Sequence, residues 1–154
     1  KGERHPIDVA DILRSSANLI SHQERRERIE IKVETAPGVP LVNADAGQIQ
    51  QAIIVLGTNA IDAMPDGGVL TFRVAAETNR VAIEVEDTGV GIPAENLSKI
   101  FEPFFTTKAV GEGTGLGLAV CYGIITDHGG RLGVRSNADR GGTTFTITLP
   151  ITSK

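Results

Sequence analysis

Apolar residues recur at helical spacing in three stretches of the chain, each bounded by residues that start or stop helices. In the second stretch, for example, Ile49, Ile53 and Leu56 fall on one side of a helix. A capping aspartate precedes the first two stretches, and a glycine pair follows the third. We therefore expect three helices: about Val9–Arg26 after the N-cap Asp8, about Ala46–Met64 after the N-cap Asp45, and from Leu116 to about Asp127 before His128-Gly129-Gly130.

Other stretches alternate apolar and polar residues, which is the pattern of a strand with one buried face. Turn-forming residues separate these stretches. The expected strands are Ile29–Glu34, one around Leu70–Val74, Val81–Glu86, Leu132–Ser136 and Thr143–Leu149. We also expect a hairpin near Thr78-Asn79-Arg80 and one helical turn near Glu95–Ile100. Helices on one side of a mixed, mostly antiparallel sheet fit this order best, which is a two-layer α/β sandwich of the α+β class.

The composition indicates one globular domain over residues 1–154 and excludes some classes of partner. A net charge of −4 argues against general binding to nucleic acids or acidic membranes. The single cysteine, Cys121, excludes an internal disulfide and fits a cytoplasmic environment, and its apolar neighbours predict a buried helix residue. Without a signal peptide or long apolar run, we expect no direct membrane contact. Because the chain starts at Lys1 without methionine, we expect it to be a piece of a longer protein. A membrane anchor elsewhere in that parent protein would be compatible with this composition.

Glycines cluster between Asp87 and Leu118, first at Gly89 and Gly91 and then from Gly111 to Gly117. Glycine loses much conformational freedom on folding, so such clusters mark tight turns or a close approach to another molecule. The second cluster runs into the expected third helix, where unpaired N–H groups and the helix dipole attract an anion. We interpret the stretch as a nucleoside triphosphate site in which Asp87 recognises the base and the second cluster holds the phosphates.

Strand phase places Asp87 on the apolar side of its strand, because Val81, Ile83 and Val85 point the same way. A carboxylate there needs a hydrogen-bond donor, and the exocyclic amine of adenine would supply one. The alternative is an aspartate that only caps a turn. Thr143 is in phase with the apolar face of the last strand, so it would lie near Asp87 and contact the same base, unless the backbone satisfies its hydroxyl.

Asn59 and Asp62 lie three residues apart on the expected second helix and share a face. Asparagine is a poor residue for a helix interior, so its position there calls for a reason. Its amide oxygen would suit Mg²⁺ bound to phosphates, whereas the alternative is a solvent-facing polar pair. Lys108, which follows Thr106 and Thr107, would either reach the terminal phosphates or only keep its loop soluble.

Three phenylalanines stand in a connection that should be polar. We expect Phe101 to anchor this connection on the core, while Phe104 and Phe105 fit either an anchor or a docking patch. Other phosphate-binding motifs fail: no glycine precedes a lysine, as a P-loop requires, and the G-x-G-x-G run does not follow a strand. Eukaryotic protein-kinase signatures and Cys/His metal clusters are also missing from the sequence.

Together these motifs resemble the ATP-binding catalytic domain of two-component sensor histidine kinases. The wider group includes the ATPases of type II topoisomerases, heat-shock chaperones and mismatch repair. The resemblance covers essentially the whole chain, with every motif in order. The motifs are Asn59–Ala63 (the asparagine box), Asp87–Ile92 (the first glycine box), Phe101–Lys108 (the phenylalanine box, similar to that of nitrogen-regulation sensors), Gly113–Leu118 (the second glycine box) and Gly142–Phe145 (the closing motif).

The resemblance implies a pocket for ATP between the helices and the sheet, under a lid over about residues 93–114, and transfer of the γ-phosphoryl group to a histidine. It implies that Asp87 binds the adenine amine, that Asn59 holds Mg²⁺, and that Asn59 and Lys108 act in catalysis. The ATP-binding residues it implies are Asn59, Asp62, Ala63, Asp87, Gly89, Gly91, Ile92, Thr106, Thr107, Lys108, Gly113, Thr114, Gly115, Leu116, Gly117, Leu118 and Thr143.

Two departures from the family pattern refine this expectation. Val55 stands where many sensor kinases have a second asparagine and hydrolysing ATPases have a water-activating glutamate, which counts against an efficient ATPase. None of His5, His22 and His128 has the sequence context of a phosphoacceptor, so we expect the dimerisation and acceptor helices to lie upstream in the parent protein. We expect a response regulator to be the partner of the parent protein. Since those helices would carry the dimer contacts, we expect this chain by itself to be a monomer. The alternatives are a hydrolysing ATPase clamp and a nucleotide-sensing module without transfer activity.

Overall fold

The structure is a computed structural model that describes residues 3–21, 28–92, 94–102, 117–136 and 141–151. Within these residues the chain forms β1 (His5–Ile7), α1 (Val9–Ile20), β2 (Ile29–Thr35), β3 (Val42–Ala44), α2 (Ala46–Asp62), β4 (Gly68–Glu77), β5 (Arg80–Glu86), the short 3₁₀ helix η2 (Ala94–Asn96), α3 (Gly117–Asp127), β6 (Arg131–Ser136) and β7 (Thr143–Pro150). No helix among them is both long and apolar enough to span a bilayer.

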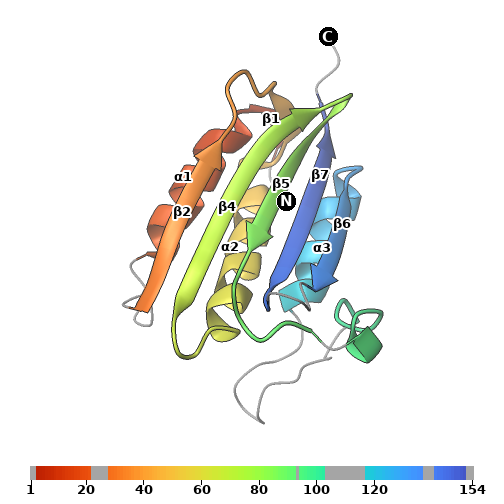
Figure 1. Ribbon diagram of the computed structural model, residues 1–154. Helices are drawn as coiled ribbons and strands as arrows, with labels where there is room; N and C mark the ends of the chain where they lie inside the picture. Colours follow the sequence, from red (N-terminus) through yellow and green to blue (C-terminus); the bar gives the residue numbers. More distant parts are fainter. Residues whose placement is uncertain (1–2, 22–27, 93, 103–116, 137–140, 152–154) are drawn as a thin grey trace.

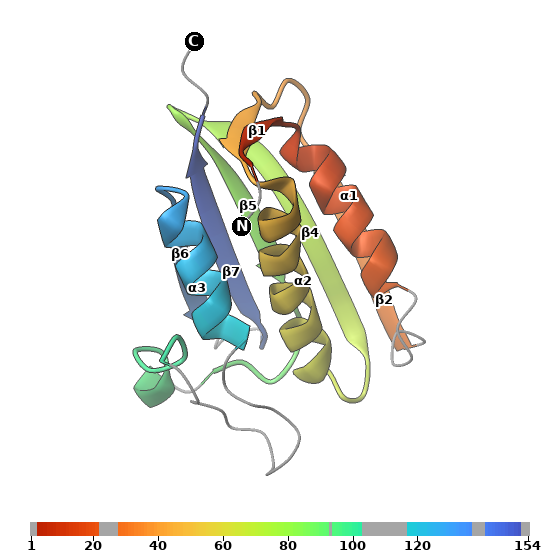
Figure 2. The ribbon, with the colours of Figure 1, turned by 180° about the vertical axis from the view of Figure 1, so that it is seen from behind.

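Five strands form one sheet in the order β2-β4-β5-β7-β6, and the three α-helices cover one of its faces (Figures 1 and 2). The pairing of β2 with β4 is parallel, and the other three pairings are antiparallel. β4 and β5 form one hairpin, β6 and β7 form another, and the β5–β7 pairing joins the two. The expected two-layer sandwich with a mostly antiparallel sheet is confirmed.

The core lies between the helices and rows of apolar side chains that cross the sheet. Residues opposite each other in an antiparallel pair point to the same face. One such row runs from Phe72 through Val85 and Phe145 to Val134. Phe72, Val85 and Phe145 are buried, as are the sheet-facing residues of the helices. This layer of packed apolar side chains supplies the main favourable term in folding.

The two predicted N-caps are confirmed, but two helices end earlier than predicted. Asp8 accepts a hydrogen bond from the N–H of Ala10, and Asp45 accepts one from the N–H of Gln48. α1 ends at Ile20 instead of Arg26, because Ser21 caps it and its hydroxyl bonds back to the carbonyl of Asn18. α2 ends at Asp62, two residues before the predicted end at Met64. The predicted glycine cap of α3 is confirmed, with Gly129 at φ +77° and the N–H of Gly130 bound to the carbonyl of Ile125.

β1 and β3 form a two-stranded antiparallel sheet that was not predicted. The sequence indicated only an extended segment at the position of β1. His5 pairs with Ala44, and Ile7 pairs with Val42. Each strand is three residues long, which is too short for a periodic signal. Both strands end directly before an N-cap, so this small sheet fixes where α1 and α2 begin.

Cys121 lies on α3 and is fully buried, as predicted. Its sulfur is 3.6 Å from the carbonyl oxygen of Ala52 on α2. Burial raises the pKa of the Cys121 thiol to about 12, because the thiolate would lose its hydration. Cys121 therefore acts as a small packing residue between α2 and α3.

The face of the sheet opposite the helices carries charge, centred on Arg73 of β4. Its guanidinium lies 2.6 Å from Glu86, 2.8 Å from Glu34 and 3.2 Å from Glu84. These contacts, with the hydrogen bond to Glu86 largest, hold the pKa of Arg73 above its usual value. Because Arg73 is partly exposed, water screens the cluster and its contribution to stability is small.

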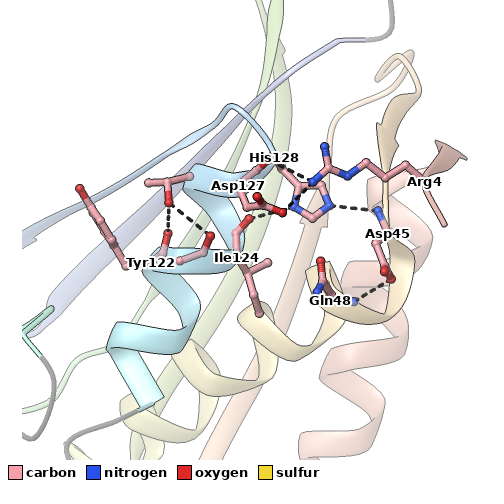
Figure 3. Close-up of polar contacts among 9 residues, drawn as sticks. Arg4, Asp45, Gln48, Tyr122, Ile124, Asp127 and His128 are labelled. Carbon is pink, nitrogen blue, oxygen red and sulfur yellow. Dashed lines mark hydrogen bonds and ion pairs between the residues drawn. The ribbon is translucent and has the colours of Figure 1, made fainter. Parts of the chain in front are cut away.

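A polar joint ties the beginning of α2 to the end of α3 (Figure 3). The Nδ1 of His128 lies 2.8 Å from the carbonyl oxygen of Ile124, and its Nε2 lies 3.1 Å from the backbone nitrogen of Asp45. A carbonyl can only accept and a backbone N–H can only donate, so the geometry requires a neutral imidazole protonated on Nδ1. Arg4 adds an ion pair at 2.8 Å to Asp127, next to this histidine. His128 and Asp45 are both buried, so the joint fixes how the two antiparallel helices lie against each other.

We predict that His128→Ala lowers the free energy of unfolding by about 1–3 kcal/mol, because it removes the buried hydrogen bond from the N–H of Asp45 to the imidazole. Urea denaturation at pH 7 measures this loss. His5→Ala is the control, since His5 is an exposed histidine and its removal should change stability by no more than about 0.5 kcal/mol. Equal effects of the two substitutions would contradict a structural role for His128.

Candidate functional site

The predicted site residues gather at one end of the molecule. The last turns of α2, the end of β5, the start of α3 and the start of β7 all lie at the end opposite the His128 joint (Figures 1 and 2). At this end, the position that a Cβ on Gly117 would occupy is 3.4 Å from the side chain of Val55. The start of α3 is therefore in contact with the middle of α2, as a site shared by the two helices requires.

At this end of the sheet, the last row on the helix-covered face changes from apolar to polar. Leu70 continues the apolar face on β4, but the next three positions across the sheet are Asp87, Thr143 and Ser136. Ser136 pairs with Thr143 in the β6–β7 register, and Thr143 faces Asp87 beyond the last β5–β7 pair. We call Asp87, Thr143 and Ser136 the polar row.

Asp87 is 3% exposed, and its two carboxylate oxygens have different surroundings. Oδ1 accepts hydrogen bonds from the backbone N–H of Gly89 at 2.8 Å and of Thr143 at 3.2 Å. Oδ2 receives none from the residues that the structure describes. No fully buried side-chain oxygen or nitrogen among these residues lacks a partner, so Oδ2 must reach solvent. Asp87 therefore caps a turn through one oxygen and leaves the other available for a ligand.

Burial raises the pKa of Asp87, because desolvation disfavours its negative charge. The N–H groups of Gly89 and Thr143 oppose this shift by stabilising the carboxylate, and the neighbouring charge of Glu86 adds to it. Asp87 is therefore a carboxylate whose ionised form is less stable than in water. A hydrogen-bond donor at Oδ2 would relieve this cost.

Thr143 is the residue that faces Asp87, as strand phase predicted. The two residues are joined through the N–H of Asp87, which donates to the carbonyl of Thr143 at 2.9 Å. Thr143 is 3% exposed, and its hydroxyl makes no hydrogen bond within the described ranges. No backbone group among the described residues therefore forms a hydrogen bond with this hydroxyl, contrary to the alternative interpretation.

Two glycines near Asp87 are required by the protein chain itself. A Cβ on Gly89 would collide with the carbonyl oxygen of Ala63, and one on Gly142 would collide with that of Asp87. The sequence predicts that clustered glycines mark tight turns or a close approach to another molecule, and these two glycines let the strands and the helix meet around Asp87. Gly91 adopts a φ of +77°, which favours glycine for its conformation alone.

α2 presents its predicted polar residues beside this turn. Asn59, Asp62 and Ala63 are half-buried, and the carbonyl of Ala63 accepts the N–H of Val90 at 3.1 Å. The side-chain amide of Asn59 has no hydrogen-bond partner in the described part of the chain. The described residues contain no group of three or more His, Cys, Asp or Glu side chains that could hold a metal. A cation here would therefore need oxygens from phosphate and water besides that of Asn59, which is the preference of Mg²⁺.

Two side chains that hold the turn after Asp87 were missed from the sequence. The hydroxyl oxygen of Thr88 accepts the N–H of Val69 at 3.1 Å, and that of Ser136 accepts the N–H of Ile92 at 3.1 Å. Ser136 is in phase with Leu132 and Val134, so the strand-phase argument that found Thr143 could have found it.

Several predicted site residues lie outside the described residues. These are Thr106, Thr107, Lys108, Gly113, Thr114, Gly115 and Leu116, together with Phe104 and Phe105. Gly117 and Leu118 are the first residues of α3, with Gly117 exposed and Leu118 half-buried. Phe101 anchors its connection as predicted, because its ring stacks on Tyr122 at 5.3 Å and meets the edge of Phe145 at 6.3 Å.

Comparison with known sequences shows the family of this chain. Residues 44–153 match the family described as histidine kinase-, DNA gyrase B-, and HSP90-like ATPase. The chain is 43% identical to the sensor kinase CckA of Brucella abortus, over 94% of this chain and 17% of that protein. It is 37% identical to the sensor histidine kinase ZraS of Escherichia coli, over 94% of this chain and 30% of that protein. The chain thus spans less than a third of the length of either relative.

Solved structures share the whole fold. The nucleotide-free catalytic domain of the histidine kinase ThkA superposes with a TM-score of 0.87 at 33% identity, over 99% of this chain and 100% of that one. ThkA in complex with the response regulator protein TrrA gives 0.82 at 31% identity, over 97% of this chain and 42% of that one. The likeness therefore extends from β1 to β7.

We predict that, without ligand, Asp87→Asn is at least as stable as the wild type at pH 7. Asparagine retains the Oδ1 acceptor and removes a charge that burial disfavours. Because the folded-state pKa is raised, the stabilisation from the protonated carboxyl is present below the unfolded pKa of about 3.9 and is lost as the pH rises through the folded value. The advantage of the variant should therefore shrink as the pH falls from 7 toward 4 in urea titrations. A large loss of stability at pH 7 would instead assign Asp87 to structure alone.

Proposed function

Since this chain belongs to the histidine kinase-, DNA gyrase B- and HSP90-like ATPase family and has the fold of histidine kinase catalytic domains, we propose that it binds Mg-ATP and donates the γ-phosphoryl group to a histidine on separate helices. The observation that carries this proposal is the polar row at the end of an apolar sheet face. There, among the residues that the structure describes, a buried carboxylate has one oxygen without a hydrogen bond beside a hydroxyl without one, and such polar groups could recognise the edge of adenine.

Asp87 would accept the exocyclic amine of adenine at Oδ2, because Oδ1 is already occupied by two backbone N–H groups. Thr143 would contact the same base, directly or through water, since its free hydroxyl lies on the same face of the sheet. Guanine has a carbonyl oxygen where adenine has the amine, so a carboxylate at this position would reject it. We infer that the site is specific for adenine.

The phosphates would lie toward α2 and the start of α3. Asn59 would give Mg²⁺ one oxygen ligand while phosphates and water supply the rest, and the ion would neutralise charge that develops during transfer. Asp62, Ala63, Gly117 and Leu118 would line the same side of the site. Thr106, Thr107, Lys108, Gly113, Thr114, Gly115 and Leu116 complete the proposed nucleotide contacts, with Lys108 reaching the terminal phosphates.

Val55 favours transfer over hydrolysis. It occupies the helical turn before Asn59 and packs at the start of α3, and an aliphatic side chain cannot activate water as a general base. Positioning of the acceptor histidine and neutralisation of the phosphate charge would then supply most of the catalysis.

The acceptor would come from dimerisation helices upstream in a longer cytoplasmic or membrane-anchored parent, and the phosphoryl group would pass on to a response regulator. The complex of ThkA with TrrA concerns such a pair in a similar protein. The phenylalanine box that begins at Phe101 suggests a subtype close to nitrogen-regulation sensors.

We expect the chain to form phosphohistidine when it is mixed with the parent protein's helical segment and γ-labelled ATP. Acid-labile, base-stable label on that segment is the readout, and Asn59→Ala serves as the inactive control because it removes the proposed Mg²⁺ ligand. Binding of nucleotide without any transfer would instead indicate a sensing module, and steady release of phosphate by this chain alone would indicate a hydrolysing clamp.

Asp87→Asn should weaken ATP binding about 10- to 200-fold, because the new amide presents a donor where the adenine amine also donates. Calorimetric titration with Mg-ATP measures this loss. Asp66→Asn is the matched control, since it removes the same charge from an exposed turn near α2. Affinity of Asp87→Asn within twofold of the wild type would place the base elsewhere.

A further inference from the structure

Ser136 completes the polar row, and no step of the proposed function uses it. It is the last residue of β6, half-buried, and it faces Thr143 across the β6–β7 pair. Because Leu132 and Val134 point toward the helices, Ser136 points the same way. Ser136 thus has a hydroxyl at the end of an apolar strand face, which is the feature that identified Thr143 as a candidate contact of the base.

The hydroxyl of Ser136 is engaged with the turn that follows Asp87. Its Oγ accepts the N–H of Ile92 at 3.1 Å, and a Cβ on Gly91 would lie only 3.0 Å from it. Gly91 therefore suits this position for two reasons: a side chain would crowd the Oγ of Ser136, and the φ of +77° favours glycine. Since Oγ acts as acceptor here, the hydroxyl proton remains available, and it has no acceptor in the described part of the chain.

The turn is held from both sides of the site. On the α2 side, the N–H of Val90 donates to the carbonyl of Ala63. On the β6 side, the contact from Ile92 to Ser136 is the one hydrogen bond that the described residues provide. Between them the side chain of Val90 is 79% exposed, whereas Ile92 is half-buried and packs against the core. Ser136 therefore holds the Ile92 end of the turn over the polar row by a hydrogen bond, together with this packing.

We propose that Ser136 is a positioning residue for the nucleotide base: it holds the turn 87–92 in the conformation that directs Asp87 Oδ2 and the backbone near Ile92 at the ligand. This inference rests on the proposed function. It adds a side chain from β6 to a site otherwise built from α2, β5, β7 and α3. The free hydroxyl proton of Ser136 faces the same end of the sheet, where it can bind water or the ligand.

The test compares wild type, Ser136→Ala and Ser136→Thr by calorimetry with two ligands in the presence of Mg²⁺. One ligand is ATP, and the other is purine riboside triphosphate, which has the same phosphates but lacks the exocyclic amine. Ser98→Ala is the matched control, because Ser98 is an exposed serine that makes no hydrogen bond with described residues.

We expect Ser136→Ala to weaken ATP binding about 3- to 10-fold, as the loss of one neutral hydrogen bond predicts. The loss should be smaller with purine riboside triphosphate, because that ligand has no amine for Asp87 to accept. Ser136→Thr, which retains the oxygen, should restore most of the affinity, and Ser98→Ala should match the wild type. The midpoint of urea unfolding without ligand should stay close to that of the wild type for all variants.

Other outcomes overturn the inference. Wild-type affinity in Ser136→Ala would remove Ser136 from the site and leave the proposed function intact. Equal losses with both ligands would indicate a general disturbance instead of base positioning. Failure of the wild-type protein to bind ATP would reject the proposed function and this inference with it.

Discussion

The constraint on which this molecule depends is a carboxylate buried at the end of an apolar strand face. A buried charge must be paired or hydrogen-bonded, and Asp87 meets this requirement through only one of its oxygens. The two N–H groups at Oδ1 hold the side chain in one orientation, and in that orientation Oδ2 has no hydrogen bond from the described residues. Oδ1 of this side chain thus stabilises the fold, and Oδ2 is the atom that we propose binds the ligand.

Much of the surrounding backbone is arranged to allow this. Gly89 lets the turn touch the end of α2, and Gly142 lets the start of β7 touch the end of β5, at distances where any side chain would collide. The two helices that flank the site are pinned together at their other ends by His128 and Asp45. This joint, with the contact between the start of α3 and the middle of α2, limits how far the helices can shift beside the site.

Strand phase carried most of what the sequence could predict about the site. The alternation that ends in Asp87 and Thr143 correctly placed both side chains on the buried face, and capping rules located the starts of α1 and α2. The same rules missed β1 and β3, which are too short to show a period, and extended α1 beyond Ser21 because polar and charged residues after it are acceptable in a helix. The sequence places His128 in a helix stop and gives it no phosphoacceptor context, but it does not predict the contact with Asp45, because local patterns carry no information about contacts between residues so distant in sequence.

The pairing of β5 with β7 joins two hairpins that are each local in sequence, and it does so through partners as distant as Arg80 and Pro150. Asp87 follows one hairpin, whereas Thr143 and Ser136 belong to the other. The proposed base site therefore lies across the β5–β7 pairing and forms only when this long-range pairing has formed. A nucleotide that contacts both sides would bridge the β5–β7 pairing, so its binding would stabilise this pairing against unfolding.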